Sequence, residues 1–216
     1  TPRLPDGLLP IKRDVGSLQS PGGCCLLSFA SDPILTAASQ FISHWVQSQG
    51  DVEAVFMLPN TFHITLMNTG FISNAQLSAC MDRVTPPSPF PVRVTGLGVF
   101  EQEDKSVLYF AIEPNDGLIQ LQQLVYDNTI SAGVIASDYS KPENWTPHIT
   151  IAYIHKGGPI PELLEPFEVT PSELHWTREV YKPALKLPMR HKGVRVGKHY
   201  ELAFNLSRAQ YLITCQ

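Results

Sequence analysis

Apolar residues recur with the 3.6-residue period of an α-helix in three parts of the chain. The first follows Asp32-Pro33, where Asp is a common N-cap residue and Pro suits the first helical turn. It carries apolar side chains on one face and ends before Gly50. These patterns predict amphipathic helices at about 33–49, 74–84 and 117–132.

Short apolar runs with the two-residue alternation of a β-strand lie between these helices, and turn residues separate them. One such run follows the turn at Pro59-Asn60 and ends at Gly70. The other predicted strands are Cys24–Phe29, Val52–Leu58, Val92–Phe100, Ser106–Ile112, Pro147–Tyr153, Phe167–Val169, Leu174–Tyr181 and Tyr200–Leu206.

The order of these elements suggests two lobes, because each half supplies a helix, several strands and one copy of a short motif described below. Residues 1–22 are rich in Pro, Gly and Ser and are expected to form an irregular lead-in. A stiff proline-rich connector at 85–91 marks the expected seam between the lobes. We therefore expect a single bilobal α+β domain over residues 23–216.

The pattern His-x-Thr occurs twice, as His63-Ile64-Thr65 and as His148-Ile149-Thr150, each time inside a predicted strand. Alternation along a strand places each His and its Thr on one face. The intervening Ile64 and Ile149 would then point into the core. If the two strands met, two imidazoles and two hydroxyls would share one cleft, as acid–base chemistry on a phosphate ester requires.

Composition excludes several classes of protein. With 43% hydrophobic and 17% charged residues, the 216-residue chain is that of a folded protein, and a net charge of −4 gives no general polyanion-binding surface. No apolar stretch approaches the roughly 20 residues that cross a bilayer. The four cysteines lack metal-ligand spacing and resemble buried, reduced thiols of an intracellular protein. We expect a cytoplasmic protein, with a nuclear location as the alternative, and neither metal nor cofactor.

The two motifs and their surroundings resemble the 2H phosphoesterases, which include bacterial RNA 2′,3′-cyclic phosphodiesterases once described as 2′-5′ RNA ligases. That family is defined by two His-x-Ser/Thr motifs about a lobe apart. The resemblance extends from about Cys24 to Leu206 and includes the strand Leu108–Pro114 and the segment Asn144–Tyr153. It implies a bilobal α+β fold, with two antiparallel-rich sheets around a central cleft, helices on the outside and a metal-free site.

By this analogy, His148 is the base that activates water and His63 is the acid that protonates the leaving ribose oxygen. The two roles would exchange if the product were the other phosphomonoester, because the family cleaves toward either a 2′- or a 3′-phosphate. Thr65 and Thr150 would donate hydrogen bonds to the non-bridging phosphate oxygens.

Other residues are weaker candidates for substrate binding. Tyr109 and Tyr153 could stack on a base, although the alternative, a core or cleft-wall aromatic, is favoured for each. Lys156 could contact a phosphate or be a solvated loop residue. The basic loop with Arg190, Lys192 and Arg195 could hold RNA phosphates or be an exposed hairpin.

The resulting hypothesis is a monomeric, metal-independent phosphodiesterase that hydrolyses a 2′,3′-cyclic phosphate at an RNA 3′ end or on a nucleotide. One alternative is a phosphodiesterase for 2′,5′-linked or cyclic oligonucleotides. The others are an RNA-end binding module without turnover, and reversible 2′-5′ ligation at the same site.

Overall fold

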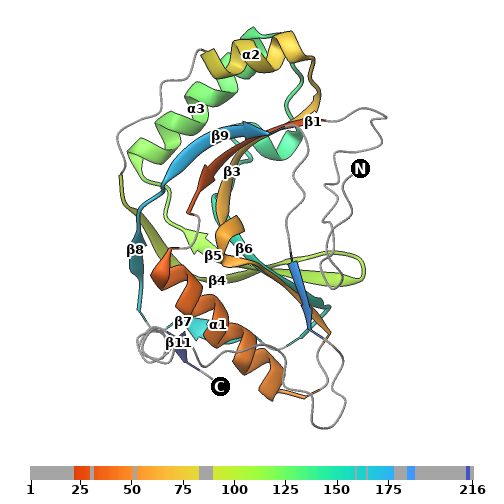
Figure 1. Cartoon of the computed structure of the whole chain (residues 1–216), viewed down its shortest axis with the longest axis vertical. Helices are drawn as coiled ribbons and strands as arrows, with labels where there is room; N and C mark the ends of the chain where they lie inside the picture. The colour runs from red at the N-terminus through yellow and green to blue at the C-terminus, as the bar shows by residue number, and fades with distance from the viewer. Residues whose placement is uncertain are drawn as a thin grey trace.

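The computed structural model describes residues 22–29, 32–50, 53–82, 90–158, 160–163, 165–177, 184–187 and 213–214 (Figure 1). Most of the predicted lead-in, residues 85–89 of the predicted connector and the strand Tyr200–Leu206 lie outside these residues. So does the basic loop with Arg190, Lys192 and Arg195. The division into a lead-in and a bilobal domain therefore stays a prediction.

The three predicted helices are present in the described residues. The Asp32 carboxylate accepts hydrogen bonds from the backbone N–H groups of Ile34 and Leu35, at 2.9 and 3.0 Å, as an N-cap should. Asn115 caps the third helix through the N–H of Leu118 at 2.8 Å. The helices are α1 (Pro33–Ser48), α2 (Asn74–Asp82) and α3 (Asp116–Ser131), with short 3-10 turns η1 (Pro59–Thr61) and η2 (Asp138–Ser140).

Eight of the predicted strands are observed within a few residues of their expected ends. They are β1 (Gly22–Ser28), β2 (Ala54–Met57), β3 (His63–Phe71), β4 (Val92–Glu101), β5 (Lys105–Ile112), β6 (His148–His155), β8 (Phe167–Val169) and β9 (Glu173–Thr177). The sequence did not predict β7 (Glu162–Leu163), β10 (Ala184–Leu187) and β11 (Ile213–Thr214). These strands have only two to four residues, a length over which alternation is a weak signal, although β2 and β8 are as short and were predicted.

The main sheet is antiparallel, with the strand order β8-β4-β5-β6-β3-β1-β9, and β2 and β10 extend from β6. The edge of β6 is shared, because Ile149 pairs with Ile64 of β3 whereas Ala152 to Ile154 pair with β2. The part β3-β1-β9 therefore joins the rest of the sheet through one residue pair. The α+β class with antiparallel sheets is confirmed, and the two expected sheets are connected at this point.

One hydrophobic core runs through both parts of the sheet. Ile64 and Ile149 are fully buried, and they belong to one cluster with residues of α1 and α3. In Figure 1, α2 and α3 lie beside the β3-β1-β9 part and α1 lies beside the part formed by β4, β5 and β6. None of the helices in the described residues has the length and apolar sequence needed to cross a bilayer.

Candidate active site

The two His-x-Thr motifs lie on neighbouring strands in antiparallel register. Ile64 pairs with Ile149, so His63 lies opposite Thr150 and Thr65 lies opposite His148. Because both isoleucines point into the core, the four motif side chains share the other face of the sheet. The structure thus brings together two motifs that are far apart in the chain.

The four motif side chains differ in their exposure to solvent. Thr65, His148 and Thr150 are half-buried, whereas His63 is only 7% exposed. His63 is more enclosed because β1 flanks β3 on its other side, with Ser28 paired opposite His63. The two histidines therefore have different access to solvent although their motifs are identical.

Both imidazole rings are held by the same backbone contact. The Nδ1 atom of His63 lies 2.7 Å from the carbonyl oxygen of Thr61, and Nδ1 of His148 lies 2.9 Å from that of Thr146. A carbonyl oxygen can only accept, so Nδ1 carries the proton in each ring. In the neutral ring the lone pair is then on Nε2, which is the atom able to take a proton from water.

This contact shows that the repeat is longer than His-x-Thr. Thr61 to Thr65 and Thr146 to Thr150 both have the sequence Thr-x-His-Ile-Thr, and the carbonyl of the first Thr receives the imidazole N–H. Sequence reasoning missed the first Thr because its contribution comes from the backbone. The match between the two longer segments was the available signal.

Two aromatic rings stand beside His148. Tyr109 of β5 and Phe100 of β4 are stacked with their centroids 4.2 Å apart, and their centroids lie 5.3 and 4.9 Å from that of the imidazole. Gly98 permits this arrangement, since a Cβ at that position would overlap the Tyr109 ring. Tyr109 thus lies at the motifs, and its stacking on a base stays a prediction. Phe100 was not predicted, and the signal was its place after two alternate glycines on the strand that pairs with that of Tyr109.

The other two described candidates lie farther along β6. Tyr153 pairs with Val107, two residues from Tyr109, so both tyrosines share the face that carries the motifs. The ammonium of Lys105 lies 5.3 Å from the centroid of the Tyr153 ring, in cation–π contact. Lys156 is exposed in the turn after β6, eight residues beyond His148 and therefore roughly 25 Å along the strand. The structure does not bring Lys156 to the motifs.

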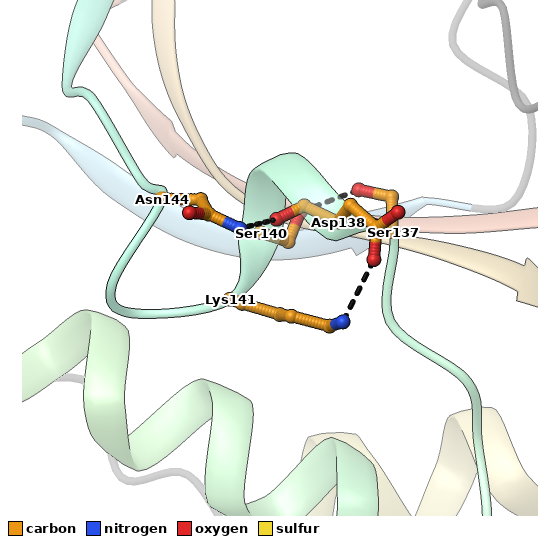
Figure 2. Close-up of polar contacts among 5 residues, drawn as sticks. All are labelled: Ser137, Asp138, Ser140, Lys141 and Asn144. Atoms are coloured by element: carbon orange, nitrogen blue, oxygen red, sulfur yellow. Dashed lines mark hydrogen bonds and ion pairs between the residues drawn. The ribbon is translucent and has the colours of Figure 1, made fainter.

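A braced loop precedes the second motif (Figure 2). The ammonium of Lys141 lies 2.7 Å from the carboxylate of Asp138, and the side-chain amide of Asn144 donates to the Asp138 carbonyl at 3.0 Å. The hydroxyls of Ser137 and Ser140 lie 3.0 Å apart in a further hydrogen bond. Lys141 lowers the pKa of the Asp138 carboxyl, mainly through its hydrogen bond and to a lesser degree through its positive charge. Local contacts therefore shape the loop that leads to His148.

Possible metal ligands do not cluster. Among the residues that the structure describes, no three His, Cys, Asp or Glu side chains lie close enough to hold an ion. Cys24, Cys25 and Cys80 are buried thiols that form no disulfide within the described part of the chain. Burial raises the pKa of the Cys25 thiol well above its usual value, so this side chain is an unreactive part of the core.

Solved structures share this fold. TT0787 of Thermus thermophilus is 19% identical and superimposes with a TM-score of 0.57, covering 79% of this chain and all of that one (100%). Escherichia coli LigT complexed with 3′-AMP is also 19% identical, with a TM-score of 0.54 and coverage of 78% and 99%. A third structure, named only as a phosphoesterase, is 18% identical with a TM-score of 0.53 and the same coverage. At these identities the likeness establishes the fold.

Sequence comparison establishes the family. No curated protein sequence matches the chain significantly. The family model of the 2′-5′ RNA ligase superfamily matches residues 36–179, which is more than half of the chain and includes both motifs and the aromatic pair beside His148. The chain therefore belongs to the 2′-5′ RNA ligase superfamily, the 2H phosphoesterases, a family of phosphodiesterase type.

Proposed function

We propose that the protein hydrolyses 2′,3′-cyclic phosphates of RNA ends or nucleotides to phosphomonoesters, with His63 and His148 as its acid–base pair. The observation that supports this most is the pairing of Ile64 with Ile149, because it sets both histidines and both threonines on one face. A phosphate bound between the motifs would have an imidazole and a hydroxyl on each side. The pseudo-twofold arrangement suits in-line displacement, in which the attacking and leaving oxygens lie on opposite sides of phosphorus.

The chemistry needs two proton transfers. Water attacks phosphorus while one neutral imidazole takes its proton at Nε2, and the bond from phosphorus to one ribose oxygen breaks. The other imidazole, as imidazolium, gives its Nε2 proton to that oxygen. The product is a phosphomonoester whose ribose carries a free hydroxyl where the bond broke. The two histidines have exchanged protonation states. The hydroxyls of Thr65 and Thr150 would donate to the non-bridging oxygens, where negative charge builds up.

Exposure favours His148 as the base. The base must meet a water molecule from solvent, and His148 is half-buried whereas His63 is 7% exposed. His63 is then the acid at the ribose oxygen. If the substrate bound in the opposite orientation, the roles would exchange and the other phosphomonoester would form.

The aromatic pair gives the site a place for a base. Phe100 is 37% exposed and is stacked on Tyr109 beside His148, so its outer face can receive a nucleobase. Tyr153 and Lys105 lie farther along the same face, where a second nucleotide of an RNA chain would pass. The fold-related LigT structure contains 3′-AMP, a nucleotide, which agrees with this proposal. Arg190, Lys192 and Arg195 remain candidates for phosphate contacts from outside the described residues.

The test is incubation with 2′,3′-cyclic AMP in the presence of EDTA, followed by ³¹P NMR. We expect conversion to a single AMP isomer without added metal, and the isomer reveals which ribose oxygen left. Loss of turnover in EDTA that returns with a divalent metal would contradict the two-histidine mechanism. Hydrolysis of a 2′,5′-linked dinucleotide but not of the cyclic phosphate would replace the proposed substrate. Tight binding without turnover at any pH would identify an RNA-end binding module.

A further inference from the structure

The second edge of β3 is completed in an unusual way. β6 pairs with β3 only at Ile64, so the backbone groups of β3 that follow need other partners. Farther along, the segment 135–137 takes over as a neighbouring strand would. Gly70 donates to the Ile135 carbonyl at 2.9 Å, Ser137 donates to the Asn68 carbonyl at 2.8 Å, and Thr69 and Ala136 form a bridge.

Three side chains fill the gap between β6 and this segment. The indole N–H of Trp145 donates to the Thr65 carbonyl at 2.9 Å. The amide of Gln122, on α3, donates to the Leu66 carbonyl at 3.2 Å and to the Ser140 carbonyl at 2.8 Å. The Ser140 hydroxyl accepts from the N–H of Asn68 at 2.8 Å. Side chains therefore bond to backbone groups at three positions of β3, namely the carbonyls of residues 65 and 66 and the N–H of residue 68.

We propose that Trp145 is a positioning residue whose indole N–H holds Thr65 in place opposite His148. The pair Ile64–Ile149 is a single point of attachment, and the two strands could turn relative to each other about it. The bond from Trp145, three residues before His148, to the carbonyl of Thr65 is a second point. Two points fix the relative orientation of the strands, and with it the place of the Thr65 hydroxyl relative to the His148 ring.

The contribution of the N–H can be separated from that of the ring. Trp145 is half-buried and packs against the core, so Trp145→Phe keeps most of the apolar contact and removes only the donor. Trp176 on β9 is a matched control. Its indole nitrogen is buried but has no hydrogen-bond partner among the described residues, so Trp176→Phe changes ring size without breaking such a bond.

The kinetic part of the test rests on the proposed function. With 2′,3′-cyclic AMP, Trp145→Phe should lower kcat about 10- to 100-fold with little change in KM, because a small misplacement weakens transition-state contacts more than binding. Trp176→Phe should leave kcat close to the wild-type value. In a Thr65→Ala background, Trp145→Phe should have little further effect, since the two act through one hydroxyl. Fully additive losses would contradict the positioning role.

A second measurement does not depend on activity. Hydrogen exchange of the segments 62–68 and 146–151 should accelerate in Trp145→Phe and stay unchanged in Trp176→Phe. Unchanged exchange in Trp145→Phe would overturn the inference whatever the enzyme's kinetics. Faster exchange, together with a wild-type protein that cleaves no cyclic phosphate, would keep the role of Trp145 in aligning the strands and reject the proposed function instead.

Discussion

The two copies of Thr-x-His-Ile-Thr differ in what surrounds them, although their internal contacts are the same. In both, the imidazole N–H bonds to the carbonyl two residues earlier, and the isoleucine is fully buried. His63 lies in an inner strand with β1 beside it and is nearly buried. His148 is half-buried and lies against the rings of Phe100 and Tyr109.

This difference separates two levels of control. The five-residue sequence sets the imidazole tautomer and the face of the strand on which the His and Thr side chains lie, because both depend on local backbone geometry. The neighbouring strands set access to solvent and the contacts of each ring, which decide whether an imidazole meets water or the leaving group. A duplicated motif can thus supply two chemically different groups.

Replacement of either histidine should have the largest effect. His63→Ala and His148→Ala should each lower kcat by a factor on the order of 10² to 10⁴, because each removes one proton transfer. The fold should persist in both, as circular dichroism and thermal melting can show. His155→Ala is the control, since His155 is exposed at the far end of β6. Wild-type turnover by either motif variant would contradict the mechanism.

The pH dependence of kcat/KM distinguishes the two copies. A base must be neutral and an acid must be protonated, so the wild-type profile should fall at low pH through the base and at high pH through the acid. The residual activity of His148→Ala should lose the fall at low pH. That of His63→Ala should lose the fall at high pH. If His148→Ala instead lost the fall at high pH and His63→Ala lost the fall at low pH, the roles of the two histidines would be exchanged.

The threonines should have smaller effects. Thr65→Val and Thr150→Val keep a branched side chain in the strand and remove one hydroxyl donor to a charged group, worth about 1.5–3 kcal/mol. We expect kcat to fall about 10- to 100-fold in each. Thr95→Val, at an exposed position of β4, is the control. A large effect at only one of the two threonines would show that the phosphate does not lie symmetrically between the motifs.

The aromatic pair beside His148 can be tested separately from the motifs. Phe100→Leu should raise KM for 2′,3′-cyclic AMP about tenfold, because stacking on a base contributes about 1–3 kcal/mol. Gly98→Ala should act in the same direction by displacing the Tyr109 ring. Neither change should affect a cyclic phosphate without a base, such as glycerol 1,2-cyclic phosphate. Equal effects on both substrates would mean that the rings act on His148 rather than on the base.

Local patterns predicted most of the fold and the central residues of the candidate site. The cap at Asp32 and the alternation around Ile64 and Ile149 depend on neighbours in sequence, and the structure has them as expected. The site residues that were missed depend on distant contacts. Trp145 bonds to a residue 80 positions away, and Phe100 meets His148 only through the register of β4, β5 and β6.

Gln122 shows a signal that could have been read. It is one of the buried positions of α3, which are Leu118, Leu121, Gln122, Val125 and Thr129. An amide on a mostly apolar helix face is expected to have hydrogen-bond partners in the interior. The sequence therefore indicated an internal tether, but not that the carbonyls of Leu66 and Ser140 would receive it.

The loop before the second motif contrasts buried and exposed contacts. Ser140 is 3% exposed and its hydroxyl accepts from the N–H of Asn68. Ser140→Ala leaves that half-buried donor without the hydroxyl, which costs about 1–3 kcal/mol of unfolding free energy. Urea denaturation should show this loss as a lower midpoint with an unchanged slope. An unchanged midpoint would mean that water replaces the hydroxyl.

The smallest effect is expected at the exposed ion pair of the same loop. Lys141 lowers the pKa of Asp138 through a hydrogen bond and its charge, so the pair stabilises the folded state above the unfolded pKa of Asp, about 3.9. This contribution is lost as pH falls through the lower, folded pKa. Because both side chains are solvated, Asp138→Asn should leave kcat and the urea midpoint at pH 7 nearly unchanged. A loss at pH 7 as large as that of Ser140→Ala, disappearing in strong acid, would show that the exposed ion pair stabilises the folded state as much as the buried hydroxyl does.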